Sequence, residues 1–446
     1  MEKNRFLQVR ASFWFIPLIY GMIALLLAYV SMALDQYASK HTELYDYIPD
    51  LFLSDMQLAQ TILSSIATSL LTMTTITFSS ILVVLTTYAA QFSPRALQNF
   101  TSDRSSQRVL GMFTGGFVYT IVLLLLAKGK SGDLFIVPAL AIGVAFACLA
   151  AFVYFIHHSV ASIKVSNLIF QIASKTMKAW KENYEEDQSL NAMRDYAGAE
   201  EITSGIDRQL KSKKAGYIQH VQVRELIQAA EKSKITIKVE KSLGSYVDEG
   251  TPLLTYWGQD ELSDADSLLN QILIIPEQEP VRDVGFGIQK LSEIAIRSIS
   301  PAFNDPYTTA NAVEHIARIL TRLGKSYTPT PYYTDKAQRL RVIFHKPSFE
   351  DLLYKSFYLI RHHGKEDTAV MHSILSALTI VAENNDKEVK DIIWKFSCYI
   401  LEGLQEVDWI SLDRSYLNHQ FQKLAHACCR DGQFEGIKKG LSDESK

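Results

Sequence analysis

The sequence predicts an α-helical membrane protein with four transmembrane helices, followed by a cytosolic α+β region made of a small β-domain and a helical domain. Apolar residues are concentrated between residues 11 and 157, whereas the chain from residue 164 onward has the charged composition of a soluble protein. A helix needs about 20 apolar residues to cross a bilayer. Four stretches meet this requirement, at about 11–34, 57–90, 109–127 and 134–157, within a transmembrane domain of residues 1–160.

Basic residues beside the spans predict their orientation. Three basic residues precede the first span, three arginines follow the second and four lysines follow the fourth, whereas the loop over 35–56 is acidic. Both termini are therefore expected in the cytosol. The first span ends in Ser31-Met32-Ala33, which loosely resembles a cleavage site, but its long apolar run favours a retained anchor.

The second span is long, uncharged and rich in hydroxyl residues. No charge occurs between Asp55 and Arg95, and such a helix reaches about 50 Å, beyond the ~30 Å hydrocarbon core. Serines and threonines recur at helical spacing, which predicts a polar stripe that apolar residues interrupt before its end. The residues expected in the stripe are Thr61, Ser65, Thr68, Thr72, Thr75, Ser79, Leu82, Val83 and Thr86.

Two interpretations of this stripe stay open. Small hydroxyl residues let helices pack closely, and Gly111, Gly115 and Gly116 of the third span are natural partners. Alternatively, the hydroxyl groups line a pore and replace part of an ion's hydration shell. Because four short spans do not enclose a wide aqueous path, a pore requires a homo-oligomer around the second helix. Gln91 and Arg95 would then lie at the inner mouth, and Ser93-Pro94 predicts a short helix over 94–108.

Composition excludes several other classes of function. A net charge of −3 gives no reason to expect nucleic acid as a partner. Four cysteines, at positions 148, 398, 428 and 429, form no C-x-x-C pair, which suits a reducing cytosol. His426 with Cys428 and Cys429 lacks a second half-site, so we expect no metal and no other cofactor. No catalytic motif occurs, so we expect no enzyme.

The cytosolic part is expected to contain a helical connector (161–212), a small β-domain (213–260) and a helical domain (261–446). Residues 216–221 predict a strand, residues 223–233 a short amphipathic helix, and Ile235, Ile237 and Val239 alternate as a half-buried strand. The segment from Gly244 to Leu254 resembles the turn of a barrel-sandwich domain, and its glycines indicate tight turns. Further helices are expected at about 348–363, 367–384, 387–404 and 415–430.

A distinctive turn follows a helix that ends near Ser300. Asp305-Pro306 is expected to cap the next helix, with Asn304 and Asp305 satisfying free N–H groups. The same turn is a candidate site for an ion or ligand. Its residues would be Arg297, Ser300, Asn304, Asp305 and Thr308, and the two roles are compatible.

Four motifs carry a resemblance to a known family. They are Ala89 to Arg95 after the hydroxyl-rich span, Gly216 to Gln219, Gly244 to Leu253, and Ser298 to Thr308. Over nearly its whole length the chain resembles the bacterial predicted membrane proteins that carry the domain of unknown function 2254. In the last motif that family more often has Gly and Ile where this chain has Ala302 and Phe303. The resemblance implies a bacterial inner-membrane location, and it carries over no activity to this chain.

These observations favour a homo-oligomeric ion channel or conduit, lined by the second helix and regulated by the cytosolic domain. Its expected partners are the lipid bilayer, further copies of the chain and inorganic ions. The alternative is a non-conducting sensor or scaffold, anchored in the membrane, that binds a cytosolic partner.

Overall fold

The chain forms two compact units, residues 1–167 (the membrane unit) and 168–446 (the C-terminal unit). The computed structural model describes residues 15–40, 49, 53–91, 104–126, 136–162, 164–205, 207–258, 264–276, 284–326, 331–405 and 407–434. Each unit is described separately below.

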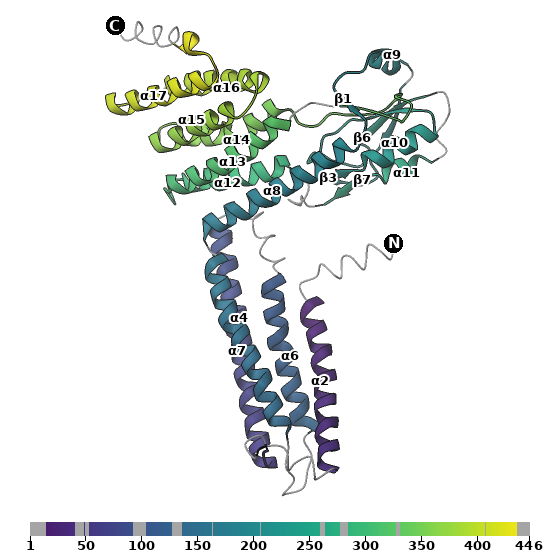
Figure 1. The fold of residues 1–446 in the computed structure, drawn as a ribbon, viewed down its shortest axis with the longest axis vertical. Coiled ribbons are helices and arrows are strands. Elements are labelled where there is room, and N and C mark those ends of the chain that lie inside the picture. The colour runs from purple at the N-terminus through teal and green to yellow at the C-terminus, as the bar shows by residue number, and fades with distance from the viewer. Residues whose placement is uncertain are drawn as a thin grey trace. The chain divides into compact units, whose positions relative to one another are not determined.

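The described residues of the membrane unit form four long helices (Figure 1), and all are long and apolar enough to cross a membrane. They are α2 (Phe15–Lys40), α4 (Met56–Gln91), α6 (Arg104–Leu126) and α7 (Val137–Ser162). The predicted four-span organisation is thus confirmed. One detail differs, because residues 104–108, expected in a separate short helix, belong to α6, where Ser106 and Gln107 are already buried. Residues 94–103 of that expected helix lie outside the described residues.

Helix α6 packs against the other three helices, and its glycines make this close approach possible. A Cβ atom on Gly115 would lie 3.1 Å from the carbonyl oxygen of Tyr20 in α2, and one on Gly111 would lie 2.9 Å from the Tyr20 ring. A Cβ atom on Gly116 would meet Cys148 of α7 at 3.0 Å and Leu70 of α4 at 3.1 Å. The glycines therefore contact Tyr20, Leu70 and Cys148, and their expected packing on the hydroxyl stripe is wrong.

Asp35 ties the first span to the last. It was expected in the acidic outer loop, but it lies near the end of α2, where it is buried. Its carboxylate accepts a hydrogen bond of 2.7 Å from the backbone N–H of Ile136, directly before α7. The first N–H groups of a helix have no partner within the helix, so this contact satisfies one of them. Ser31, one turn earlier, hydrogen-bonds to Tyr119 of α6 at 3.0 Å.

The C-terminal unit contains a six-stranded sheet of order β1-β8-β9-β4-β6-β2 and a three-stranded sheet of order β5-β3-β7. Pairing is antiparallel except between β4 and β9. The strands are β1 (Ala192–Met193), β2 (Arg208–Lys211), β3 (Gly216–Val221), β4 (Thr236–Val239), β5 (Tyr246–Val247), β6 (Pro252–Trp257), β7 (Ile272–Ile275), β8 (Tyr332–Thr334) and β9 (Leu340–Phe344). Short helices α9 (Ala199–Thr203), α10 (Val223–Lys232) and α11 (Ala265–Leu269) accompany them.

The predicted strand at 216–221 and the amphipathic helix after it are confirmed as β3 and α10. Gly244 and Gly250 have φ of 78° and 83°, the left-handed conformation that the predicted tight turns require. The likeness of this segment to a barrel-sandwich domain stays a prediction. The six-stranded sheet also recruits β8 and β9 from the range expected to be helical. Residue 342 pairs with Ile237, a contact between segments too far apart in sequence for local periodicity to reveal.

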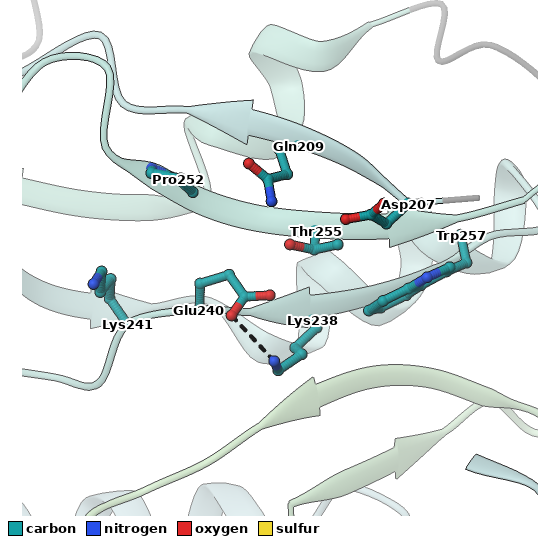
Figure 2. A pocket seen from close by; sticks show the side chains of 8 residues that line it. All are labelled: Asp207, Gln209, Lys238, Glu240, Lys241, Pro252, Thr255 and Trp257. Carbon is teal, nitrogen blue, oxygen red and sulfur yellow. Dashed lines mark ion pairs between the residues drawn. The ribbon is translucent and has the colours of Figure 1, made fainter. Parts of the chain in front are cut away.

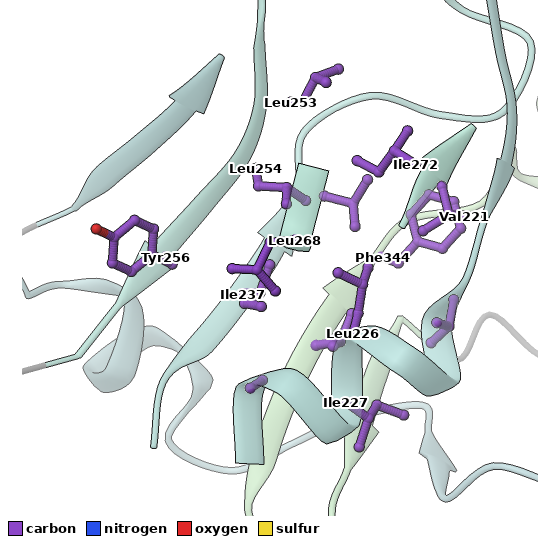
Figure 3. Close-up of a cluster of buried hydrophobic side chains, with 14 of the residues drawn as sticks. Val221, Leu226, Ile227, Ile237, Leu253, Leu254, Tyr256, Leu268, Ile272 and Phe344 are labelled. Atoms are coloured by element: carbon purple, nitrogen blue, oxygen red, sulfur yellow. The ribbon is translucent and has the colours of Figure 1, made fainter. Parts of the chain in front are cut away.

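The core of the β-region lies between α10 and the strands (Figure 3). Leu226 of α10 packs in one buried cluster with Ile237 of β4 and Phe344 of β9. Burying side chains of this size stabilises the fold by about 1.5–3 kcal/mol each. Apolar contact between α10 and the sheet therefore holds β4 and β9 together.

Six helices follow the sheets or alternate with them: α12 (Val284–Ser298), α13 (Pro306–Ser326), α14 (Phe349–Gly364), α15 (Thr368–Glu383), α16 (Lys387–Gln405) and α17 (Ser411–Ala427). The predicted bounds of the last four, the predicted end of α12 and the predicted start of α13 agree with the structure to within four residues. α15 contacts α13, α14, α16 and α17, and eight of its residues are buried. It is the central helix of this layer. Its Asp367 caps the helix by accepting hydrogen bonds from the N–H groups of Ala369 and Val370.

The β8–β9 turn depends on one buried carboxylate, that of Asp335. It accepts hydrogen bonds from the Arg341 guanidinium (2.9 Å), the Arg339 guanidinium (3.0 Å) and two backbone N–H groups. The side chains of Asp335 and Arg341 are 0% and 7% exposed. Burial raises the pKa of Asp335, but these hydrogen bonds outweigh it and hold the pKa at about 2.

We predict that Asp335→Asn lowers the stability of the C-terminal unit by about 3 kcal/mol, because it leaves the Arg341 charge buried and unpaired. Thermal unfolding of the purified chain, followed by tryptophan fluorescence, measures this. In the wild type, the folded pKa of about 2 lies below the unfolded value, about 3.9. The stabilisation is therefore complete above about pH 4 and is lost as the pH falls through the folded pKa.

Asp408→Asn is the matched control. Asp408 also pairs with an arginine, Arg414, at 3.5 Å, but its side chain is fully exposed, and exposed pairs contribute about 0–1 kcal/mol. Equal loss of stability in both variants would contradict the role assigned to Asp335.

A second prediction concerns the helix contact at Gly115. Gly115→Leu should lower the thermal stability of the full-length protein in detergent, because the new side chain would meet the Tyr20 backbone. Gly143→Leu, on α7, is the control, since a Cβ atom there has open space around it. A Gly115→Leu protein as stable as Gly143→Leu would show that α2 and α6 do not pack at this position.

Candidate functional site

The nine residues of the predicted hydroxyl stripe lie on α4, and every one of them is exposed on the surface of the chain. They are Thr61, Ser65, Thr68, Thr72, Thr75, Ser79, Leu82, Val83 and Thr86. At about 3.6 residues per turn they occupy one continuous face of the helix. The stripe is therefore a property of the outer surface of this chain.

The opposite face of α4 makes the contacts to α6 and α7. It is buried and almost entirely apolar. Its buried residues are Ala59, Leu63, Ala67, Leu70, Thr77, Ile81 and Val84. Within one chain, helix packing thus uses the apolar face and leaves the hydroxyl stripe uncovered by the described part of the membrane unit.

The five threonine hydroxyls of the stripe donate their protons to carbonyls of their own helix. Thr68, Thr72 and Thr75 each donate to the carbonyl four residues earlier, at 2.9, 2.9 and 3.0 Å. Thr61 does the same at 2.8 Å, and Thr86 donates to Val83 at 2.9 Å. A hydroxyl has one proton and two lone pairs. Once the proton points along the helix, the oxygen presents its lone pairs outward.

The interior of the membrane unit is filled by side chains. Leu63, Tyr119, Leu123 and Ala141 belong to one buried cluster, and Phe113 is fully buried beside Phe152. A packed apolar core of this kind holds no continuous water. A polar path along α4 would therefore run outside the four-helix bundle of one chain.

Gln91 and Arg95 are the two residues predicted at the inner mouth. Gln91 is the last residue of α4, and its side chain lies outside the described residues, as does Arg95. The structure adds nothing to their predicted role.

The five residues of the predicted ligand turn come together between α12 and α13. They are Arg297, Ser300, Asn304, Asp305 and Thr308. Asp305 accepts hydrogen bonds from the N–H and the hydroxyl of Thr308, at 3.1 and 2.6 Å, and so caps α13 as predicted. Asn304 adopts φ of 45°, a left-handed conformation that asparagine tolerates. Ser300 donates to the Arg297 carbonyl at 2.7 Å.

These contacts give the turn a structural role, and ligand binding there stays a prediction. The sequence interpretation missed the buried pair beneath it, Ser298 and Thr309. Their hydroxyl oxygens are 2.8 Å apart, and Thr309 Oγ1 lies 2.9 Å from the Ala295 carbonyl oxygen. The pair joins the end of α12 to the start of α13. The presence of one polar residue on the buried face of each helix could have predicted this pair.

A hollow of ≈ 390 Å³ lies on the open face of the six-stranded sheet (Figure 2). Gln209, Thr255 and Lys238 form a row across β2, β6 and β4. Lys238 pairs with Glu240 at 3.1 Å. Because these charges neutralise each other, the hollow has the character of a solvated sheet face.

A larger hollow, of ≈ 500 Å³, lies between α13 and α8 (Val165–Gln188). Four basic residues line it, Lys178 and Lys181 from α8 and Arg318 and Arg322 from α13. The sequence interpretation did not identify this groove, because it considered each helix separately. The spacing of three and four residues within each basic pair was the available signal.

Metal-binding chemistry finds little support in the described residues, where no group of three or more His, Cys, Asp or Glu side chains comes together. Near the end of α17, His426 lies 3.3 Å from Asp431. Cys428 is buried, which raises the pKa of its thiol to about 11, while Cys429 is exposed.

Four apolar spanning helices joined to a mixed helical and sheet region define a multi-pass α-helical membrane protein. The chain belongs to the family described as "Predicted membrane protein (DUF2254)", whose model matches residues 10–379. The resemblance predicted from the four sequence motifs is thereby confirmed.

The relatives of this chain are bacterial. Uncharacterized proteins of Mycobacterium bovis and of two strains of Mycobacterium tuberculosis are each 28% identical to it over 337 residues. The matched region covers 73% of this chain, and the chain spans 64% of the length of these relatives. No solved structure matches the chain.

The α12–α13 turn generates a prediction about stability. Asp305→Ala should lower the stability of the C-terminal unit by about 1 kcal/mol, because it removes the cap of α13. Asp305→Asn keeps an oxygen acceptor and should lose only part of this. Thermal unfolding of the full-length variants measures both. If Asp305→Ala melts like the wild type, the carboxylate does not act as a cap.

Proposed function

We propose that the chain is one protomer of a homo-oligomeric ion conduit in the bacterial inner membrane, lined by the hydroxyl stripe of α4 and regulated by the C-terminal unit on the cytosolic side. The observation that carries the proposal is the position of the stripe. It lies on the face of α4 opposite to the one that packs against α6 and α7. The packed bundle of one chain supports placing the path between copies.

The length of α4 is consistent with this role. Its 36 residues extend about 54 Å at 1.5 Å per residue, whereas the hydrocarbon core is about 30 Å thick. An uncharged helix of this length gains from contact with other protein surfaces where it leaves the hydrocarbon. Neighbouring copies of α4 would supply that contact.

The direction of the hydroxyl protons favours cations over anions. Thr68, Thr72 and Thr75 use their protons within the helix, so the groups facing a path would be oxygen lone pairs. Oxygen atoms replace water around a cation, as in known selectivity filters. An anion would require donors, which this face supplies poorly.

Flux through liposomes that contain the purified full-length chain tests the proposal. We expect K⁺ flux in the wild type, reduced about tenfold in Thr72→Leu and in Ser79→Leu. Each substitution removes one hydroxyl from every copy, and the loss of even one contact to a permeating ion, at about 1.4 kcal/mol, is tenfold in rate.

Ser69→Leu is the matched control. Ser69 is exposed on the same helix and donates to the Ser65 carbonyl at 2.8 Å, but it lies off the stripe. It should conduct like the wild type. Absence of flux for both cations and anions, or equal loss in Ser69→Leu and Thr72→Leu, would refute a path along the stripe.

The hydrogen bonds of the stripe also favour the alternative, a non-conducting sensor or scaffold. Because the hydroxyls are satisfied within their own helix, the stripe tolerates lipid or a dry contact with a second copy. Under this alternative the C-terminal unit binds a cytosolic partner. The full-length chain would then be silent in liposomes yet retain that partner in a pull-down when Thr72 is replaced by Leu.

A further inference from the structure

The groove between α8 and α13 combines positive charge with an apolar floor. Phe170, Ala173 and Met177 of α8 and Ile319 of α13 supply the apolar lining, and Trp180 lies at one side. Phe170 is 55% exposed, so part of its ring is available for contact with a ligand. The groove volume of ≈ 500 Å³ is within the range of small-ligand sites, about 300–1,000 Å³.

The charge in the groove is of one sign. Among the described residues, its lining includes Lys178, Lys181, Arg318 and Arg322 and no aspartate or glutamate. On α8, Glu182 and Glu185 lie one turn beyond Lys178 and Lys181 and meet them at 3.8 and 3.6 Å. All four of these side chains are largely exposed, and such pairs are weak and screened by salt. An anion in the groove would compete with them easily.

His315 lines the same groove. Its ring meets that of Phe170 edge-on at 6.2 Å, and its Nδ1 atom is buried with no hydrogen-bond partner among the described residues. Burial and the neighbouring Arg318 charge lower the pKa of His315, although Glu314 opposes this. A buried ring nitrogen without a partner is normally compensated by a ligand or by water.

We propose that this groove binds a phosphate-bearing ligand, whose anionic group lies against Arg318 and the lysines and whose apolar part lies on Phe170 and Met177. Arginine is suited to phosphate because its planar guanidinium donates two parallel hydrogen bonds. The source of the phosphate is either a phospholipid headgroup or a free phosphate compound. The inference goes beyond the proposed conduit and does not depend on conduction.

The position of α8 in the chain gives such a ligand a consequence. α8 begins at Val165, directly after the last spanning helix ends at Ser162. A ligand that contacts both α8 and α13 would hold two helices of the C-terminal unit together. Ligand binding is thus coupled to the stability of the α8–α13 contact.

Calorimetric titration of the full-length chain in neutral detergent tests the proposal with three probes. These are inorganic phosphate, short-chain phosphatidylglycerol, and short-chain phosphatidylcholine, whose headgroup has no net charge. We expect saturable binding of at least one anionic probe, weaker at high salt. Arg318→Gln should weaken it at least tenfold.

Arg414→Gln is the matched control, because it removes an exposed arginine from α17, outside the groove. Thermal unfolding shows whether each variant is folded. If Arg318→Gln is not, Lys178→Gln with Lys181→Gln tests the α8 wall, whose side chains are 78% and 70% exposed.

The results separate the two sources of phosphate. Binding of inorganic phosphate that depends on Arg318 supports a free phosphate ligand, and binding of phosphatidylglycerol alone supports a lipid headgroup. Binding of neither, binding of all three probes alike, or equal loss in Arg414→Gln would overturn the proposal. Flux measurements play no part in these outcomes, so failure here leaves the proposed conduit to its own test.

Discussion

Helix α6 must approach α2, α4 and α7 at once, and the architecture of the membrane unit depends on that close contact. Its glycines lie against the Tyr20 backbone on one side and against Leu70 and Cys148 on the other. Without a hydrophobic force between helices in lipid, such contacts rely on van der Waals packing. Because the apolar face of α4 packs against α6 and α7, the hydroxyl face on the other side of the helix points outward.

A polar stripe on the outer surface of a membrane bundle is tolerable because of its local chemistry. Each unsatisfied polar group costs several kcal/mol in hydrocarbon. Thr61, Thr68 and Thr72 avoid this cost because each donates a hydrogen bond to the backbone carbonyl four residues earlier in α4. The stripe is therefore compatible with lipid during assembly and with water or a second helix afterwards. Carbonyls that accept an extra hydroxyl bond also tend to bend a helix slightly.

The elements that could be predicted from the sequence are those with local signals. Apolar runs located the four spans, and Asp305-Pro306 marked the start of α13. The turn at Gly244 was visible for the same reason, since glycine is favoured at positive φ. Non-local partners were not predictable. The pairing of β9 with β4, the cap that Asp35 provides for α7, and the groove between α8 and α13 each join residues about a hundred or more positions apart. In the candidate site, residue spacing predicted the stripe on α4, but it did not predict which face of α4 packs against α6 and α7.

The hydrogen bond between Asp35 and Ile136 joins residues 101 positions apart, so its two partners are synthesised at different times. At a synthesis rate of about 5–20 residues per second, α7 follows Asp35 out of the ribosome after roughly 5–20 s. During that interval the Asp35 carboxylate has no hydrogen bond to Ile136. The contact between Tyr20 and the glycines of α6 likewise forms only after α6 has been synthesised. The contact between the first and the last span therefore forms late. A substitution of Asp35 would affect the last step of membrane assembly as well as the stability of the folded protein.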